Sequence, residues 1–456
     1  MYALLKDYII ALKPRRVEHF LLFSILLYSA GTFFYSNITT TVGQIFRLSG
    51  FLLFVSTIVK NSKEQPFSGF PLLLYILLLI DITFITFYTF FIADTSLIGS
   101  SLYEMGMNVY SSEYFAPSIM PFMLIVFQKG YHIDINYIVG FMTIIAIVYL
   151  LISPFALTNM LLFKYDATAE LDFNDKGGYG EFINESTLHI TAFETPVIMY
   201  FWKRYFSNKH WLLFLSVSFL ALFMTLYLAR RGQSAIYGAY YASCYLLYLM
   251  YDKKTPKFAT LLAGIAIIIV GGVFFIIASH SILSLILERG MEDTRSVIEQ
   301  AFYKNLDLNC FVYGRGWFGC YYDNVYAIYR SGLETGYLTL ILRGGIVYLA
   351  LYVSLLLYSG IRGFFFSKSL FVKSYSIIIL ISILSLYPFG WPAFDFYFLF
   401  IWMGVFICNN EYYLKMTDNQ VKLLFYKRTD FLMLWLMYIW PYTRNIQKNN
   451  LLNDRR

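Results

Sequence analysis

The stretch LETGYLTLILRGGIVYLALYVSLLLYSG occupies residues 333–360 and decides the fold class of the chain. Its charged residues are Glu334 and Arg343, and most other positions are apolar. A helix that crosses the hydrocarbon core of a bilayer needs about 20 predominantly apolar residues. The stretch therefore predicts a transmembrane helix with Arg343 well inside it.

The composition extends this prediction to the whole chain. Of 456 residues, 59% are hydrophobic and 14% are charged, and mean hydropathy is +0.59, whereas soluble domains carry about 25% charged residues. We expect one all-α domain over residues 1–456, a polytopic membrane protein with about 12 transmembrane helices. The apolar runs lie at 19–36, 42–59, 70–92, 113–128, 135–155, 186–202, 211–229, 233–251, 258–279, 333–360, 374–390 and 394–408.

Basic residues predict the orientation, because Lys and Arg are retained on the cytoplasmic side during insertion. With the N-terminus inside, most of the 35 basic residues fall in cytoplasmic segments. The net charge of +7 then reflects topology, and nucleic-acid binding is not needed to explain it. We expect both termini in the cytoplasm, an uncleaved first span, and a tail over 409–456 that carries an interfacial helix at Phe431–Tyr442.

Two predicted outer loops are long, at 155–185 and 279–332, while most other connections are short. Two loops of this size could form a cap over a site at the membrane surface. This asymmetry argues against a plain transporter, whose halves often show matching repeats with the site near the midplane.

Arginines gather on the predicted outer side. Arg230 and Arg231 lie in a tight turn between the seventh and eighth spans, and the second loop contributes Arg295, Arg315 and Arg330. Guanidinium is permanently charged and forks onto phosphate oxygens, so these residues suit a lipid pyrophosphate. Snorkelling to the lipid headgroups is the alternative interpretation.

Aromatic residues accompany these arginines. Trp317, Tyr321, Tyr322 and Tyr326 offer ring faces on which sugars could stack, and glycines beside Arg315 allow a ligand to approach closely. Because Tyr and Trp favour membrane interfaces in any case, an interfacial loop without a ligand is the alternative.

A series of short motifs follows in order along residues 225–350. They are Arg231-Gly232, Arg295, Gly314-Arg315-Gly316, Asp323-Asn324-Val325-Tyr326, Glu334-Thr335-Gly336 and Gly344-Gly345. This order resembles the O-antigen ligase and polymerase superfamily. Ligases of that superfamily usually carry His-Asn where this chain has Asp323-Asn324, which favours the Wzy-type polymerase branch.

The resemblance implies a GT-C-like bundle in the bacterial cytoplasmic membrane. It implies transfer of a growing glycan from undecaprenyl pyrophosphate to a hydroxyl of the next lipid-linked repeat unit, with no cofactor. A separate membrane protein that regulates chain length is a possible partner in such systems, and membrane lipid is the surrounding medium.

For this reaction Arg231 and Arg295 are expected to stabilise the departing pyrophosphate, with Arg230, Arg315 and Arg330 in support. A general base must take the acceptor proton, and the candidates in order are Asp323, Glu334 and Glu185. A ligase or other lipid-linked glycan transferase, and a flippase for lipid-linked oligosaccharides, stay open as alternatives.

The scattered histidines match no metal-ligand pattern, so no metal site is predicted. Charges inside spans are candidates for function, and a buried Asp81–Arg343 pair is one possibility; Arg47 and Glu194 could instead line a polar cavity. Cys310 and Cys320 share the second outer loop and are either free thiols or a disulfide.

Overall fold

A computed structural model gives the structure of the chain. The part that it describes covers residues 17–37, 40–61, 66–92, 115–127, 142–143, 145–154, 192–201, 208–227, 231–251, 294–323, 328–330, 332–333, 335–389 and 392–421.

This part of the chain is mostly helical, and its helices are those of a membrane protein. Among the described residues, four helices are long and apolar enough to cross a bilayer, at Thr41–Asn61, Phe70–Phe91, Gly336–Phe366 and Leu370–Tyr387, and shorter apolar helices accompany them. The prediction of an all-α membrane-embedded protein is confirmed at this level. The count of 12 spans, the type of membrane and the orientation of the termini stay predictions, and the predicted ninth span and the tail helix lie outside the described residues.

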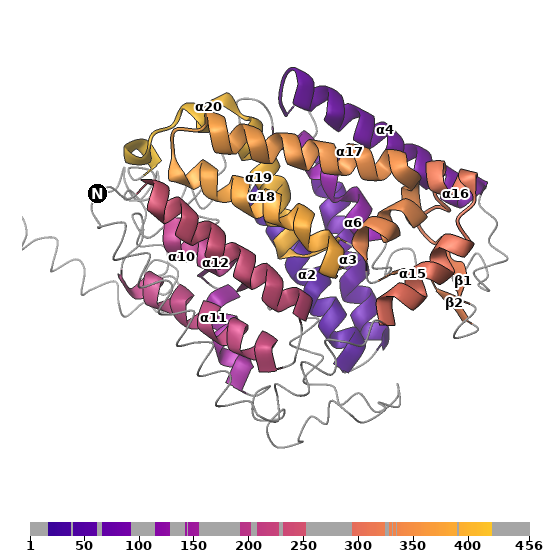
Figure 1. Ribbon diagram of the computed structural model, residues 1–456, viewed down its shortest axis with the longest axis horizontal. Coiled ribbons are helices and arrows are strands. Elements are labelled where there is room, and N and C mark those ends of the chain that lie inside the picture. The colour runs from indigo at the N-terminus through magenta and orange to yellow at the C-terminus, as the bar shows by residue number, and fades with distance from the viewer. Residues whose placement is uncertain are drawn as a thin grey trace, which may run out of the picture.

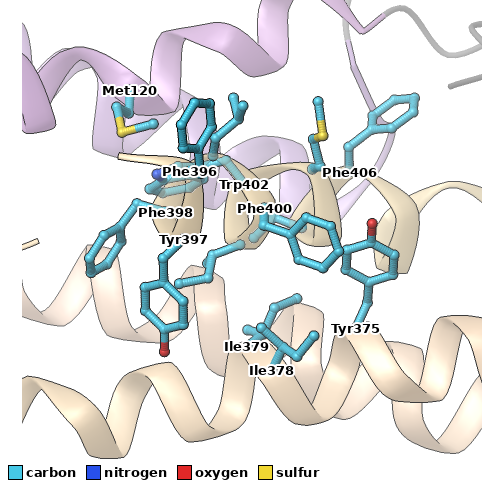
Figure 2. Packing of buried hydrophobic residues seen from close by; sticks show 14 of the residues in the cluster. Met120, Tyr375, Ile378, Ile379, Phe396, Tyr397, Phe398, Phe400, Trp402 and Phe406 are labelled. Carbon is cyan, nitrogen blue, oxygen red and sulfur yellow. The ribbon is translucent and has the colours of Figure 1, made fainter. Parts of the chain in front are cut away.

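The core is built around three consecutive helices from the C-terminal part of the chain. They are α17 (Gly336–Phe366), α18 (Leu370–Phe389) and α19 (Phe396–Asn409), followed by the short α20 (Glu411–Lys415). Every residue of α19 is buried, and Figure 2 shows its aromatic side chains packed towards α18 on one side and towards Met120 on another. A helix that is apolar all round fits this central position.

Earlier helices surround this core (Figure 1). On one side α4 runs along α17, while α12 packs on α18, and α10 and α11 lie beyond. Pro71 lies in the first turn of α4, where proline is favoured. Pro117 and Pro121 lie in the predicted fourth span, which forms a short α-helix followed by a 3-10 helix. The bounds are α4 (Phe70–Phe91), α6 (Phe115–Ile119), η2 (Met120–Val126), η3 (Ala192–Glu194), α10 (Thr195–Phe201), α11 (Asn208–Tyr227) and α12 (Arg231–Tyr251).

The first two helices of the described residues, α2 (Val17–Asn37) and α3 (Thr40–Asn61), form a close hairpin. A Cβ at Gly50 would lie 2.5 Å from the Ser24 carbonyl oxygen, so the backbones approach as they do in membrane helix pairs with small residues at the contact. Buried Arg47 of α3 donates from Nε to Thr32 Oγ1 of α2 at 3.1 Å. Arg47 therefore joins these two helices.

The second predicted outer loop, 279–332, is structured in its described part. It forms α15 (Thr294–Lys304), α16 (Leu308–Tyr313) and an antiparallel hairpin of β1 (Tyr321–Asp323) and β2 (Ile328–Arg330). These two strands depart from an all-helical fold. Figure 1 places this segment beside the first half of α17 and the end of α4. We call residues 294–333 the outer segment after the predicted loop, whose side of the membrane stays a prediction. The loop 155–185 lies outside the described residues.

The α17 helix is broken at Gly345, and the outer segment packs against the break. Gly345 has φ 72° and ψ −174°, a conformation that is nearly restricted to glycine. A Cβ at this position would overlap the backbone of Val312, the residue before the end of α16. Both the backbone conformation and the close approach of α16 therefore require glycine here.

We expect Gly345→Ala to destabilise the protein, because alanine is strained at this φ and its Cβ overlaps Val312. The free energy of unfolding should fall by more than about 2 kcal/mol. Thermal unfolding of the purified protein in detergent measures this. Gly238→Ala is the matched control, since nothing lies within 4 Å of a Cβ at Gly238 in α12; an equal fall in both variants would contradict the prediction.

Candidate functional site

The outer segment is held to the membrane helices mainly through its own backbone. The N–H groups of Arg315 and Gly316 donate to the carbonyls of Leu342 and Arg343 in α17, at 2.7 Å and 3.0 Å. Carbonyl groups near a helix break need partners inside a membrane protein, because lipid supplies none. The outer segment thus provides donors to α17 on the N-terminal side of Gly345.

A second set of contacts reaches α4. The backbone N–H of Trp317 donates to Thr89 Oγ1 at 2.9 Å, and its indole Nε1 donates to Thr86 Oγ1 at 3.0 Å. A Cβ at Gly316, whose φ is 81°, would lie 2.6 Å from Thr89 Oγ1. The turn at 314–319 is therefore wedged between α17 and α4.

The predicted pair of Asp81 with Arg343 is wrong. The guanidinium of Arg343 is fully buried and donates from Nη1 to the Trp317 carbonyl and, at 3.4 Å, to the Gly319 carbonyl. Asp81 Oδ2 is buried in α4 without a hydrogen-bond partner among the described residues. The Arg343 guanidinium binds carbonyls of the turn at 314–319 instead of Asp81. A sequence pattern does not reveal these backbone acceptors.

Arg315 also holds the outer segment together. Its Nη1 donates to the Cys320 carbonyl at 2.8 Å and its Nη2 to the Asn305 carbonyl at 2.6 Å. The planar fork of guanidinium suits two acceptors on different segments. These contacts give Arg315 a positioning role, and its predicted part in pyrophosphate binding is not tested by them.

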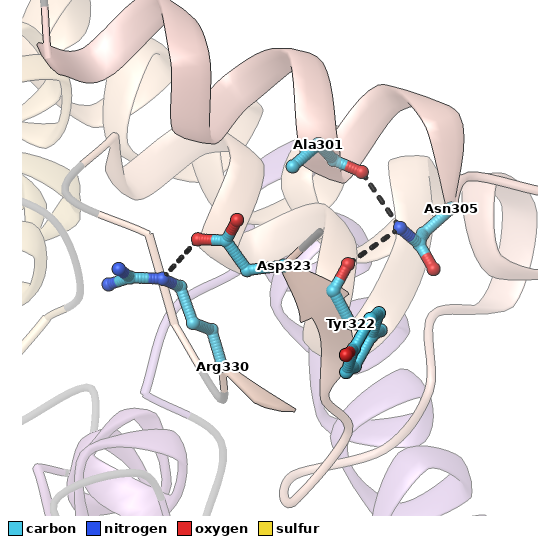
Figure 3. Close-up of polar contacts among 5 residues, drawn as sticks. All are labelled: Ala301, Asn305, Tyr322, Asp323 and Arg330. Carbon is cyan, nitrogen blue, oxygen red and sulfur yellow. Dashed lines mark hydrogen bonds and ion pairs between the residues drawn. The ribbon is translucent and has the colours of Figure 1, made fainter. Parts of the chain in front are cut away.

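Asp323 and Arg330 form an ion pair across the β-hairpin (Figure 3). Arg330 Nε lies 2.6 Å from Asp323 Oδ2, and the two side chains are 29% and 0% exposed. The hairpin pairs Asp323 with Ile328 and Tyr321 with Arg330, so the two charged residues lie diagonally across the strands. A buried carboxylate therefore orients a guanidinium that reaches the surface.

Two links in this segment were not predicted from the sequence. Asn305 donates to the carbonyls of Ala301 and Tyr322, at 2.8 Å and 2.9 Å, and so ties α15 to β1 (Figure 3). Thr335, which precedes α17, donates to Glu299 of α15. A polar residue at the end of a helix is too common a signal to identify such links in advance.

The aromatic residues of the segment divide into buried and exposed groups. Trp317 and Tyr321 are buried, and Trp317 packs edge-on against Tyr348 of α17 at 5.6 Å. Their predicted role as sugar platforms is wrong, because Tyr321 lies in the small core of the outer segment and Trp317 lies in the main helical core, against α4 and α17. Tyr322 is exposed, as the prediction requires, whereas Tyr326 lies outside the described residues.

Other predicted site residues are placed only in part. Arg231 and Arg295 stand in the first turns of α12 and α15, respectively. Arg230, Glu185 and Glu334 lie outside the described residues. The structure thus brings Arg315, Asp323 and Arg330 together in one segment, while the roles of all these residues stay predictions. In the described part of the chain no group of three His, Cys, Asp or Glu residues is placed to hold a metal ion.

Cys310 and Cys320 are both buried, and no disulfide joins them. Burial raises the pKa of each thiol above its usual value, and the nearby Arg315 guanidinium opposes part of this increase. A raised pKa keeps more of each thiol protonated at neutral and mildly alkaline pH. The thiolate is the reactive form, so both residues should be slow to alkylate.

Arg315→Lys should destabilise the protein although it keeps the positive charge. Lysine lacks the fork that joins the Cys320 and Asn305 carbonyls, and losing a charged hydrogen bond costs about 1.5 kcal/mol or more. Thermal unfolding in detergent measures the change. Lys304→Ala, at an exposed position of α15, is the control; a lysine variant as stable as wild type would show that Arg315 acts only as a charge.

Cys310 and Cys320 should alkylate more slowly in the native protein than in denatured protein at about pH 8, near the pKa of an unperturbed thiol. Raising the pH should accelerate the native reaction only at higher values than the denatured one, because the native pKa is raised. Quantitative mass spectrometry of the labelled peptides measures both rates. Equal rates, or a disulfide in the non-reduced digest, would contradict this.

Comparisons with known proteins found no relative that could assign a role to this segment. No protein-family model matches the chain, and neither the curated proteins nor the solved structures include a match. The resemblance carried by the motifs of residues 225–350 therefore stays a prediction. The function has to be inferred from the site and the motifs themselves.

Proposed function

We propose that the chain is a membrane glycosyltransferase that polymerises a bacterial surface polysaccharide. It would transfer a growing glycan from undecaprenyl pyrophosphate to the next lipid-linked repeat unit on the outer face of the cytoplasmic membrane. The sequence motifs of residues 225–350 suggest this reaction, and the outer segment gives it a structural setting.

The observation that carries the proposal is that Arg330 is partly exposed and is held in place by a buried carboxylate. The outer segment is fixed to α17 and α4 by backbone hydrogen bonds, and its hairpin holds the partly exposed Arg330 on the buried carboxylate of Asp323. A preorganised cation needs little rearrangement when charge develops on a leaving group, which is the main requirement for electrostatic catalysis. A mobile surface arginine would lack this advantage.

The reaction needs positive charge more than it needs a nucleophile from the protein. The bond between the anomeric carbon of the donor glycan and the pyrophosphate oxygen breaks, and the acceptor hydroxyl oxygen bonds to that carbon. The electron pair leaves with undecaprenyl pyrophosphate, and Arg231, Arg295 and Arg330 would stabilise it. The hydroxyl proton passes to a general base.

The base is better sought outside the hairpin. Asp323 is fully buried and already accepts from Arg330, so its contacts favour holding that arginine in place. Glu334 and Glu185 are the remaining carboxylates predicted from the sequence. Arg315 is similarly committed to the Cys320 and Asn305 carbonyls, which leaves Arg231, Arg295 and Arg330 as the stronger pyrophosphate ligands in this proposal.

A flippase for lipid-linked oligosaccharides is the second candidate, and one observation favours it. Glu194 and Asp395 are buried acidic residues of the helical core, and such residues often serve ion-coupled transport. A flippase moves its substrate without making glycosidic bonds. Its activity should therefore tolerate the loss of Arg330, which a transferase should not.

Reconstitution of the purified protein with its lipid-linked repeat unit tests the proposal. Wild type should produce a ladder of products on a gel, and Arg231→Ala, Arg295→Ala and Arg330→Ala should each reduce polymerisation at least about 100-fold, as expected for loss of one stabilising group at a developing charge. Arg330→Lys should recover only part of the activity, since lysine binds phosphate as a point charge.

The control is Arg362→Ala, which removes an arginine near the far end of α17 from the outer segment. It should leave the ladder unchanged. If the three arginine variants retain full polymerisation at normal expression, the pyrophosphate assignment is wrong. If the wild type makes no ladder but moves labelled lipid across vesicles, the flippase replaces the transferase.

A further inference from the structure

The short helix α16 has one face packed in the outer segment and another that is apolar and exposed. Cys310 lies on the packed face, in a small core that includes residues of α15, β1 and α17. Leu308, Phe311 and Tyr313 are 77%, 38% and 53% exposed, respectively. Exposed apolar side chains that lie close together usually mark a surface for a partner or a membrane.

The apolar face of α16 meets an exposed aromatic face of α4, which is a candidate membrane span. The rings of Tyr313 and Phe84 lie 6.3 Å apart between their centroids. Phe84, Phe87 and Phe91 recur at helical spacing and are 43%, 53% and 75% exposed. Large apolar side chains on the outside of a membrane helix are covered by lipid acyl chains, so Tyr313 extends a surface that faces lipid.

The position of this contact along α4 sets its depth. The 22 residues of α4 extend about 33 Å at about 1.5 Å per residue, close to the ~30 Å thickness of the hydrocarbon core. Phe84 lies seven residues before Phe91, the last residue of α4, which corresponds to about 10 Å along the axis. Tyr313 therefore lies beside the span, below its end. Figure 1 likewise shows α16 alongside the end of α4.

Burial along α17 gives the same result independently. From Gly336 to Gly345 the helix is buried except for the half-buried Tyr337, and the first exposed residue is Val347, which is 41% exposed. The backbone of α16 touches α17 at Gly345, through Val312. The exposed surface of α17 therefore begins just beyond α16. The outer segment covers the first third of this span, and α16 borders the part that lipid covers.

Polar residues mark the other end of α16. Asp307 caps the helix by accepting from the Cys310 N–H at 2.7 Å, and Asp307, Asn309 and the preceding Lys304 are all exposed. The charged groups need water or lipid headgroups, whereas Tyr313 at the opposite end meets an aromatic membrane helix. A short helix that is polar at one end and aromatic at the other fits a membrane–water boundary.

We propose that α16 lies in the membrane interface, with Leu308, Phe311 and Tyr313 against the lipids of the leaflet in which α4 ends. The partner is thus a lipid surface, and the outer segment is partly embedded in it. Because α16 shares a core with α15 and β1, this contact would also fix the height of the β-hairpin above the membrane. The proposal depends on neither candidate function.

Site-directed spin labelling of the full-length protein in phosphatidylcholine nanodiscs tests the proposal. Leu308→Cys and Tyr313→Cys each place one nitroxide on α16. Ile80→Cys, at a position of α4 that is 60% exposed, is the lipid-facing reference, and Lys304→Cys, at an exposed position of α15, is the polar reference. The natural cysteines are buried, so wild type should take up little label and measures the background.

Collisions of each nitroxide with oxygen, which concentrates in hydrocarbon, and with a water-soluble nickel complex report its depth. We expect the Tyr313 label at about 5–10 Å below the headgroups, the usual depth of an interfacial helix. The Leu308 label should be shallower, the Ile80 label deeper than both, and the Lys304 label in water. If the Leu308 and Tyr313 labels react with nickel as the Lys304 label does, the apolar face lies in water and the proposal is wrong. If neither reagent reaches them, protein covers the face, which also overturns it.

Crosslinking of wild type to lipid gives a measurement that does not depend on the variants folding. The protein is reconstituted in phosphatidylcholine vesicles with a fraction of phosphatidylcholine that carries a diazirine on its acyl chain. After illumination, mass spectrometry of the peptides should locate lipid on α16 and around Phe84 of α4, and none on the exposed face of α15 at Lys304. Lipid on α4 without lipid on α16 would contradict the proposal.

Discussion

The break in α17 at Gly345 is the constraint on which the outer part of the structure depends. Carbonyls on its N-terminal side accept from the N–H groups of Arg315 and Gly316, and this contact requires glycine on both sides of the approach. Because lipid offers no hydrogen bonds, a break of this kind is tolerated only where protein covers it. The outer segment is that cover, and its hairpin takes its place from the same contact.

Arginines in this protein serve two different purposes. Arg343 and Arg315 donate to backbone carbonyls and hold the turn at 314–319 in shape. Arg330 is held by Asp323 and remains partly exposed, which is what its proposed contact with a pyrophosphate requires. Guanidinium serves both purposes because it has several donors and keeps its charge when buried. The number of arginines in a loop therefore does not show which of them hold the loop in shape and which could bind a ligand.

The sequence predicts the coarse features of the fold well. Apolar length predicts helices because the bilayer sets the number of residues required, and four long apolar helices are found in the described part of the chain. One of them, α17, spans Gly336–Phe366 where residues 333–360 are predicted. The motif Gly344-Gly345 was recognised only as part of a resemblance. Its physical role depends on Val312, which lies more than 30 residues away in the chain and carries no recognisable signal.

Predictions about individual side chains were less successful for a physical reason. Asp81 and Arg343 were paired because they have opposite charges and similar expected depths, but the Trp317 carbonyl lies closer to the guanidinium. Trp317 and Tyr321 suit a ligand surface by residue type, because aromatics stack on sugars, yet Tyr321 is buried in the outer segment and Trp317 in the main helical core. Partners that are distant in sequence decided each outcome, and spacing along the chain does not encode them.

The hydrogen bonds between Trp317 and α4 also bear on how the protein assembles. They join residues separated by 228 and 231 positions in the chain. During synthesis, α4 would enter the bilayer long before the turn at 314–319 exists, and α17 emerges later still. Contacts so distant in sequence close late in folding. The outer segment can therefore reach its final position only after most of the chain has been made, so a protein truncated before α17 would contain Arg315, Asp323 and Arg330 without the helix against which their segment packs.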